Sequence, residues 1–99
     1  MAHRVEDAAA LVEPELEIRL QRITTRKVPM FRVVVAEAGS RADGRFLEQV
    51  GLYDPTLQTD PARFTLDRLR FWVEAGAVPV GEASGLVQAA LAPAAASPA

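Results

Sequence analysis

Cysteine is absent from this chain of 99 residues, and histidine, tryptophan and tyrosine each occur once. Without cysteine the chain can form no disulfide framework, no thiolate metal site and no cysteine nucleophile. The one histidine is His3, in an N-terminal segment where nothing is expected to bury or orient it. We therefore expect it to be neither a catalytic base nor a metal ligand.

Long apolar stretches are absent as well. Stretches such as 33–36 and 86–92 fall far short of the roughly 20 residues that a membrane-spanning helix needs. Residues 1–17 contain no long apolar stretch and carry five Asp and Glu against a single Arg. This segment resembles neither a secretory signal nor an acid-poor transit peptide. We expect no membrane partner, and the N-terminus is either mature or what remains after processing.

Groups that could carry catalysis are few. The serines have no base that the sequence places beside them, and Gly39 to Gly44 lacks the spacing of a phosphate-cradling loop. Glu37 and Asp43 flank that loop, but acids beside a glycine turn are usually solvated, and metal-ligand spacing is missing. We expect no enzyme, cofactor or small-molecule substrate. A metal-dependent hydrolase or nuclease using Glu37, Asp43 and Glu48 is kept as an alternative of a different class.

What the chain does contain is a basic centre inside an acidic protein. Residues 19–70 carry ten Lys and Arg against six Asp and Glu, a net charge of +4, whereas the whole chain carries −2. The acidic excess lies in the segments before and after this centre. Arginine-dense loops suggest contact with phosphates. The acidic flanks limit how much of the surface can make that contact.

The apolar residues of this centre predict strands. Residues 16–22 alternate between apolar and polar side chains, as in a half-buried strand. Residues 30–37 are apolar on both faces, which indicates a central strand. Residues 45–53 read as a third strand, in which Gly51 marks a bulge or a close backbone approach, and 63–66 as a short edge strand. Asp54 and Pro55 end the third strand.

Two helices follow. Leu66, Leu69, Trp72 and Val73 recur at helical spacing, with Thr65 or Asp67 as the cap and Gly76 as the stop. A second, weaker helix is predicted at 82–91, and the Ala/Pro/Ser tail beyond it is expected to form no structure alone. The predicted core between sheet and helix contains Leu16, Ile18, Leu20, Phe31, Val33, Val35, Phe46, Leu69, Trp72 and Val73.

The loops carry the candidate contacts. Arg26 and Lys27 lie in the loop at 23–29, and Arg41 and Arg45 bracket the loop at 38–44, which ends in an Asp43-Gly44 turn signal. Because loops that join adjacent strands can present side chains together, we expect these cations at one rim of the sheet. This predicts a nucleic-acid surface, with a scattered set of solvated charges as the alternative. Base stacking by aromatic residues is the less favoured role, and core packing is expected for Trp72.

The order of short motifs resembles a known family. The motifs are Ile18-Arg19-Leu20, Pro29-Met30-Phe31-Arg32-Val33-Val34-Val35-Ala36, Asp43-Gly44-Arg45-Phe46-Leu47-Glu48, Gly51-Leu52-Tyr53-Asp54-Pro55, Leu66-Asp67-Arg68-Leu69-Arg70-Phe71-Trp72 and Gly76-Ala77. Together they resemble small-subunit ribosomal protein sixteen of bacteria and organelles, over about residues 16–92 with nearly the family's spacing.

The resemblance implies an α+β fold, a small mixed β-sheet of about four strands packed against two helices. It also implies a structural role in the small ribosomal subunit, binding and stabilising ribosomal RNA during assembly and translation. Carried over by position, the RNA-contacting residues would be Arg19, Arg22, Arg26, Lys27, Arg32, Arg41 and Arg45. Such phosphate contacts fix RNA packing without reading its sequence.

This chain also departs from the family pattern. Val28 and Met30 stand where the family has Arg and Phe, Phe31 stands where it has Tyr, and Ala42 stands where it has Arg before Asp-Gly. The last helix lacks the family's basic residues, and the chain's isoelectric point is near 5.3. Each lost cation removes one expected phosphate contact.

These departures are typical of a ribosome in which protein has replaced RNA. We therefore expect a mitochondrial ribosome, with the bacterial cytoplasm or a chloroplast ribosome as alternatives. The expected organisation is an acidic extension at 1–15, the family domain at 16–92 and a tail at 93–99. The flanks are expected to contact neighbouring ribosomal proteins. A protein–protein adaptor with reduced or lost RNA binding is the alternative function.

Overall fold

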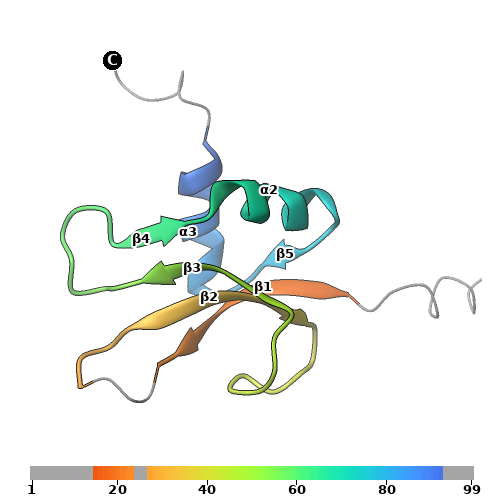
Figure 1. The fold of residues 1–99 in the computed structure, drawn as a ribbon, viewed down its shortest axis with the longest axis horizontal. Helices are drawn as coiled ribbons and strands as arrows, with labels where there is room; N and C mark the ends of the chain where they lie inside the picture. Colours follow the sequence, from red (N-terminus) through yellow and green to blue (C-terminus); the bar gives the residue numbers. More distant parts are fainter. Residues whose placement is uncertain (1–14, 24–26, 93–99) are drawn as a thin grey trace, which may run out of the picture.

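A computed structural model describes residues 15–23 and 27–92, and its sheet follows the apolar patterns of the sequence (Figure 1). The strands are β1 (Leu16–Arg22), β2 (Phe31–Glu37), β3 (Glu48–Tyr53), β4 (Ala62–Phe64) and β5 (Val78–Pro79). Their spatial order is β4-β3-β2-β1-β5, and β5 runs parallel to β1 while the other neighbours are antiparallel. The sheet is mixed and β2 is central, as predicted. The short fifth strand was not predicted.

The strand register assigns each side chain to one of two faces, because neighbours in a strand alternate. Ile18 is opposite Val35, and Val33 is opposite both Leu20 and Gly51. We call the face that carries these residues the core face. The other face, the outer face, carries Glu17, Arg19, Gln21, Arg32, Val34, Ala36, Gln49, Leu52 and Arg63.

Helix α2 (Leu66–Glu74) begins at the predicted cap Thr65, whose side chain makes no capping hydrogen bond. It ends at Gly76, which adopts a positive φ of 107°. There the Gly76 amide donates to the Val73 carbonyl at 3.0 Å, and the Ala77 amide donates to the Trp72 carbonyl at 2.9 Å. These two bonds form a Schellman motif, which satisfies the last helical carbonyls.

A carboxylate ties α2 to the sheet. Arg68 donates two hydrogen bonds of 2.7 Å to Glu48 on β3, and the Trp72 indole N–H donates a third at 2.9 Å. These bonds stabilise the ionised carboxylate and lower the pKa of Glu48 from 4.5 to about 2, with the Arg68 bonds as the largest cause. Trp72 is therefore half-buried on the core side, as its helical position predicted, with its polar edge bound.

Helix α3 (Glu82–Leu91) has the predicted bounds. Its Val87 and Ala83 are buried, and Val87 joins the same apolar cluster as Leu69 of α2. Both helices therefore cover the core face. In Figure 1 the loop between β2 and β3 lies on the far side of the sheet from α2.

One apolar cluster forms the core. Its fully buried members are Ile18, Val33, Val35, Val50, Leu69, Ala77 and Val87, and Leu16, Leu20, Trp72 and Val73 pack against it. Most of the predicted core is thus confirmed. Phe31 instead lies half-buried against Tyr53, with ring centroids 5.9 Å apart.

The assignment of Phe46 to the core is wrong. Strand β3 begins at Glu48 rather than at 45, so Phe46 belongs to the preceding loop and is 37% exposed. The apolar residues Phe46 and Leu47 suggested a strand, but at these positions the chain is still crossing the outer face. Only the Leu47 amide joins the ladder, donating to the Val35 carbonyl at 2.7 Å.

The structure shows both features predicted for Gly51, a bulge and a close backbone approach. The β2–β3 register shifts between Val33 and Val34, which makes a bulge beside it. A Cβ at Gly51 would lie 2.7 Å from the Arg63 carbonyl and 2.8 Å from the Phe64 ring. Only glycine lets β4 approach β3 this closely. The edge strand β4 lies within a residue or two of its predicted place.

Candidate nucleic-acid interface

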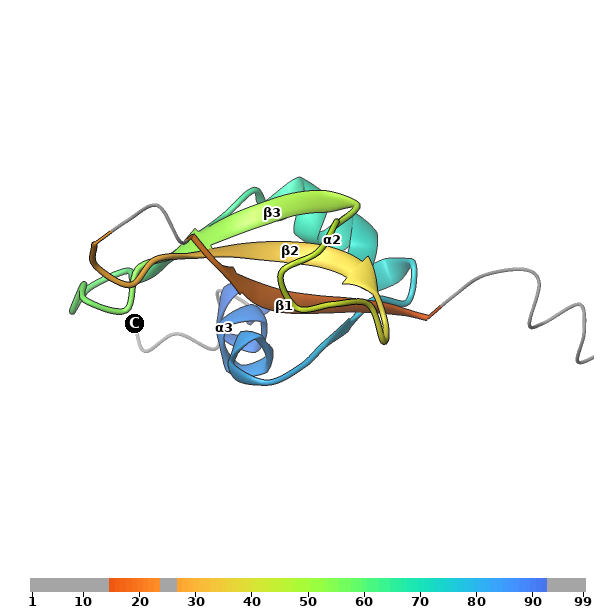
Figure 2. The same cartoon turned by 90° about the horizontal axis from the view of Figure 1, so that it is seen from below.

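The outer face and the loop at 38–47 form one surface. The loop leaves β2, crosses the outer face and returns as β3, and Figure 2 shows it in front of β1. It covers Val34 and Ala36, which are 0% and 1% exposed although they lie on the side away from the helices. We refer to this segment as the 38–47 loop.

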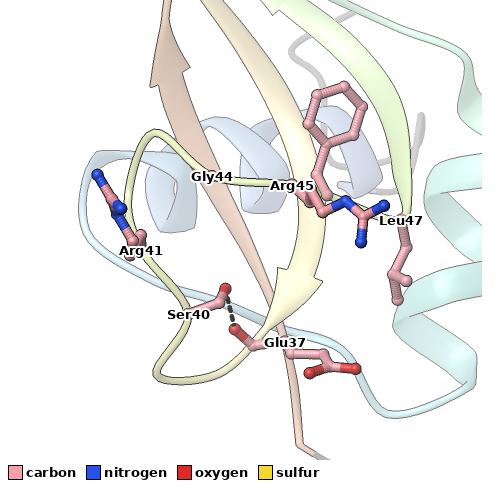
Figure 3. Close-up of a pocket in the computed structure, with 7 residues that line it drawn as sticks. Glu37, Ser40, Arg41, Gly44, Arg45 and Leu47 are labelled. Carbon is pink, nitrogen blue, oxygen red and sulfur yellow. Dashed lines mark hydrogen bonds between the residues drawn. The ribbon is translucent and has the colours of Figure 1, made fainter.

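Arg19 of β1 holds the first half of this loop. Its Nη2 group donates to the Ser40 hydroxyl at 2.6 Å and to the Arg41 carbonyl at 2.9 Å. Ser40 in turn donates to the Glu37 carbonyl at 2.6 Å, as Figure 3 shows. The Arg19 side chain is only 13% exposed and also lies 3.4 Å from a Glu17 carboxylate oxygen. Its guanidinium is thus bound by protein groups.

Gln21 holds the second half. Its side-chain amide donates to the Gly44 carbonyl at 2.8 Å and, at 3.4 Å, to the Ala42 carbonyl. The Gly44 amide donates to the Arg41 carbonyl at 3.0 Å, which closes the turn that Asp43-Gly44 predicted. Two side chains of one strand therefore fasten the whole loop to the sheet.

An open cleft of about 810 Å³ lies along the loop. Its lining includes Glu37, Ser40, Arg41, Arg45 and Phe46. In Figure 3 the side chains of Arg41 and Arg45 project from different parts of the loop, and both residues are exposed. The cleft has cationic and aromatic walls but no cluster of acids, and the described residues contain no group of three or more His, Cys, Asp or Glu that could hold a metal.

The cations of the described segments fall into two groups. Arg19, Arg41 and Arg68 have carboxylate partners, at 3.4 Å to Glu17, 3.6 Å to Asp43 and 2.7 Å to Glu48. The Arg41–Asp43 pair is exposed at both ends, so water screens it and it is weak. Within residues 15–23 and 27–92, no carboxylate lies within ion-pair distance of Arg22, Lys27, Arg32, Arg45, Arg63 or Arg70.

The predicted contact residues lie as follows. Arg32 is half-buried on the outer face, and Arg41 and Arg45 are exposed on the 38–47 loop. Arg22 ends β1 and Lys27 lies in the loop between β1 and β2, both exposed. Arg19 is on the outer face but bound by the loop, and Arg26 lies outside the described residues. Nothing here tests their contact with RNA, which stays a prediction.

The expectation that both basic loops share one rim is wrong. Strands β1, β2 and β3 are successive antiparallel neighbours, so the β1–β2 and β2–β3 loops leave opposite ends of β2 (Figure 1). Because the 38–47 loop runs back over the outer face, Arg41 and Arg45 lie on the side of the sheet that carries Arg32.

Comparison with known proteins identifies the family. A family model described as ribosomal protein S16 matches residues 22–80. The small ribosomal subunit protein bS16 of Chloroherpeton thalassium is 41% identical over 73 residues, 74% of this chain and 54% of the relative. That of Clostridium botulinum (strain Langeland) is 35% identical over 75 residues, 76% of this chain and 92% of the relative.

The chain belongs to the ribosomal protein S16 family. The bS16 protein of Chlorobium chlorochromatii is a third relative, 39% identical over 74 residues, 75% of this chain and 54% of that protein. The chain thus spans about half the length of the Chloroherpeton and Chlorobium relatives. Membership of this family supports the prediction that the chain is not an enzyme. The α+β fold that the resemblance implied is confirmed.

The matched segment of the S16 family runs from the end of β1 to the end of β5 and stops just before α3. It therefore contains the 38–47 loop, β4 and most of the outer face. The sequence reasoning missed Arg63 on β4 as a member of that face. The signal was present, since Ala62 and Phe64 are apolar neighbours on either side of Arg63, and alternation puts Arg63 on the opposite face.

No helix in the described part of the chain has the length and apolar character to cross a membrane.

Proposed function

We propose that this S16-family chain is a structural protein of the small ribosomal subunit that binds ribosomal RNA through its outer face and the 38–47 loop. The observation that carries the proposal is a set of cations on this one surface, among them Arg32 and Arg45, that have no carboxylate partner within the described residues. Phosphates are the partners such a surface would take. The relatives named above are called small ribosomal subunit proteins, which supports the assignment.

The surface suits RNA packing rather than sequence reading. Hydrogen bonds fasten the loop to β1 before any partner binds, so binding should cost little conformational entropy. Contacts to phosphates position a protein on RNA without distinguishing bases. The chain would in this way stabilise the fold of ribosomal RNA during assembly and translation.

The test is the salt dependence of binding to small-subunit ribosomal RNA. Replacing both Arg41 and Arg45 with Gln should weaken binding and lower the slope of log K against log salt by about 0.7–0.9 per lost contact. Arg70→Gln is the matched control, because Arg70 is exposed on α2, on the other side of the sheet. An unchanged slope in the double variant would reject the loop as an RNA contact.

A second function, an adaptor between ribosomal proteins, is favoured by one observation. Phe71 and Leu66 of α2 are 49% and 40% exposed, and Leu47 beside Glu48 is 53% exposed. Together with the acidic flanks predicted to contact proteins, these apolar side chains suit a protein neighbour. If binding to RNA proves weak and independent of salt while the chain still joins the subunit, the adaptor function is the correct one.

The compartment stays a prediction. The acidic composition favours a mitochondrial ribosome, whereas the relatives named above are bacterial. Co-sedimentation of the tagged chain with small ribosomal subunits from separated organelles and cytosol decides between them. The flanks proposed to contact neighbouring ribosomal proteins are residues 1–15 and 82–99, of which 1–14 and 93–99 lie outside the described residues.

A further inference from the structure

Four side chains form a row across the outer face. Gln21 of β1 is opposite Arg32 of β2, Arg32 is opposite Leu52 of β3, and Leu52 is opposite Arg63 of β4. Residues opposite one another in neighbouring strands point to the same face. The row therefore has one apolar member, Leu52, which lies between two arginines.

The two arginines are separated by two strand spacings, which is about 10 Å between backbones. Arginine side chains are long enough to converge on one ligand across that distance. Leu52 is 36% exposed and Arg63 is exposed, so the middle and the edge of the row are open to solvent. A hollow of about 250 Å³ lies beside the row, lined by Gln49, Leu52, Arg63 and Thr65 among others.

The charges of the row have no partner in the described residues. Neither Arg32 nor Arg63 has a carboxylate within ion-pair distance in residues 15–23 and 27–92. Glu17, the acid of the outer face, lies near Arg19 instead. Two cations on either side of an apolar side chain form a surface with positive potential and a place for a sugar ring.

We propose that the row Arg32–Leu52–Arg63 binds the sugar–phosphate backbone of RNA, with the arginines on phosphates and Leu52 against a ribose. The inference rests on the proposed function and extends its surface to β4, beyond the residues predicted from sequence. No member of the row is aromatic, so the row lacks the aromatic platform on which proteins stack the bases of single strands. Helical RNA, which proteins recognise by backbone and 2′-hydroxyl contacts, is the ligand that fits.

Gly51 makes this row possible. Its missing side chain lets the Arg63 carbonyl approach to 2.7 Å from where a Cβ would stand. The Asp54 amide donates to the Pro61 carbonyl at 2.7 Å, which closes the connection from β3 to β4. Arg63 thereby joins the face that carries Arg32, which lies 31 positions earlier in the chain.

The experiment measures binding of a small-subunit ribosomal RNA transcript at several salt concentrations. Arg63→Gln should lower the slope of log K against log salt by about 0.7–0.9, the value for one phosphate contact. Leu52→Ala should weaken binding at every salt concentration while leaving the slope unchanged, because it removes no charge. Arg70→Gln is the charge-matched control and should change neither quantity. Circular dichroism verifies that each variant is folded.

The outcomes separate the inference from the function on which it rests. If Arg63→Gln and Arg70→Gln behave alike while the Arg41 and Arg45 variant loses slope, the row is not an RNA contact and the proposed function stands. If the unaltered chain shows no salt-dependent binding, the proposed function fails with the inference. A transcript of single-stranded polyuridine should bind less tightly than a helical one, and tighter binding would overturn the backbone-of-helix assignment.

Discussion

The core face and the outer face of the sheet are built from the same strands, yet different interactions stabilise them. The core face is apolar: Ile18, Val33 and Val35 are 0% exposed and form one cluster with Leu69 of α2 and Val87 of α3. The outer face carries arginine, glutamine and leucine, and a loop rather than a helix lies over part of it. Burial of apolar surface dominates one side, and hydrogen bonds with solvated charge dominate the other.

This difference separates stability from recognition. Removing apolar groups from the core face should lower the free energy of unfolding and leave the charges that meet RNA unchanged. Removing a cation from the outer face should weaken RNA binding and leave the free energy of unfolding nearly unchanged, because surface substitutions usually change stability within about 0.5 kcal/mol. The predictions below test that separation, from the largest expected change in stability to the smallest.

Leu69→Ala should have the largest effect on stability. Leu69 of α2 is 0% exposed, so truncation leaves a cavity in the cluster and should lower the free energy of unfolding by about 2–5 kcal/mol. Urea unfolding followed by Trp72 fluorescence measures this change. Leu66→Ala is the matched control, since Leu66 lies in the same helix but is 40% exposed. A lower salt slope of RNA binding in folded Leu69→Ala would contradict the separation of the two faces.

The core face could be predicted because its signal is local. Period-two and helical spacing place Leu16, Ile18 and Leu69 on apolar faces whatever the rest of the chain does. The bounds of α3 followed from the same reasoning and were correct. Glycines added what spacing could not, since Gly51 and Gly76 marked the close approach and the helix end.

The outer face could not be predicted in the same way, because its arrangement depends on residues far apart in sequence. Arg19 looked like a phosphate contact, but its hydrogen bonds to Ser40 and Arg41 follow from the path of a loop some 20 residues away. Phe46 looked apolar enough for the core, but that same path leaves it exposed. Val28 stands where the family pattern has arginine and is 53% exposed. The family's arginine at this position would therefore face solvent.

Glu48→Gln should produce an intermediate effect that depends on pH. The folded-state pKa of Glu48 is about 2, below its ordinary 4.5, so the carboxylate's contribution to stability is complete above about pH 5 and is lost as the pH falls from 4.5 towards 2. The variant should therefore be less stable than the unaltered chain at pH 7, and the difference should shrink on acidification. Its effect should stay below that of Leu69→Ala, since the Glu48 side chain is 28% exposed.

Urea midpoints measured from pH 7 to pH 2 test this for both proteins. Glu74→Gln is the control, because Glu74 lies exposed at the end of α2, the helix that carries Arg68 and Trp72, and should leave the pH dependence unchanged. A difference between Glu48→Gln and the unaltered chain that stays constant with pH would show that the Arg68 and Trp72 bonds do not depend on the charge of Glu48.

Gln21→Ala should have the smallest effect on global stability and a large one on the 38–47 loop. The lost bonds to Gly44 and Ala42 should lower the free energy of unfolding by about 0.5–1.5 kcal/mol. Amide hydrogen exchange should speed up within 38–47 and stay unchanged in the core-face strands, because the loop would open without the sheet unfolding. Gln49→Ala is the matched control, an exposed glutamine of the outer face on β3. RNA affinity should fall in Gln21→Ala with no change of salt slope, since the cations of the loop remain and only their placement is lost. If loop exchange were unchanged, the Arg19 bonds and the turn closed by Arg41 and Gly44 would suffice to hold the loop, and the fastening by Gln21 would be disproved.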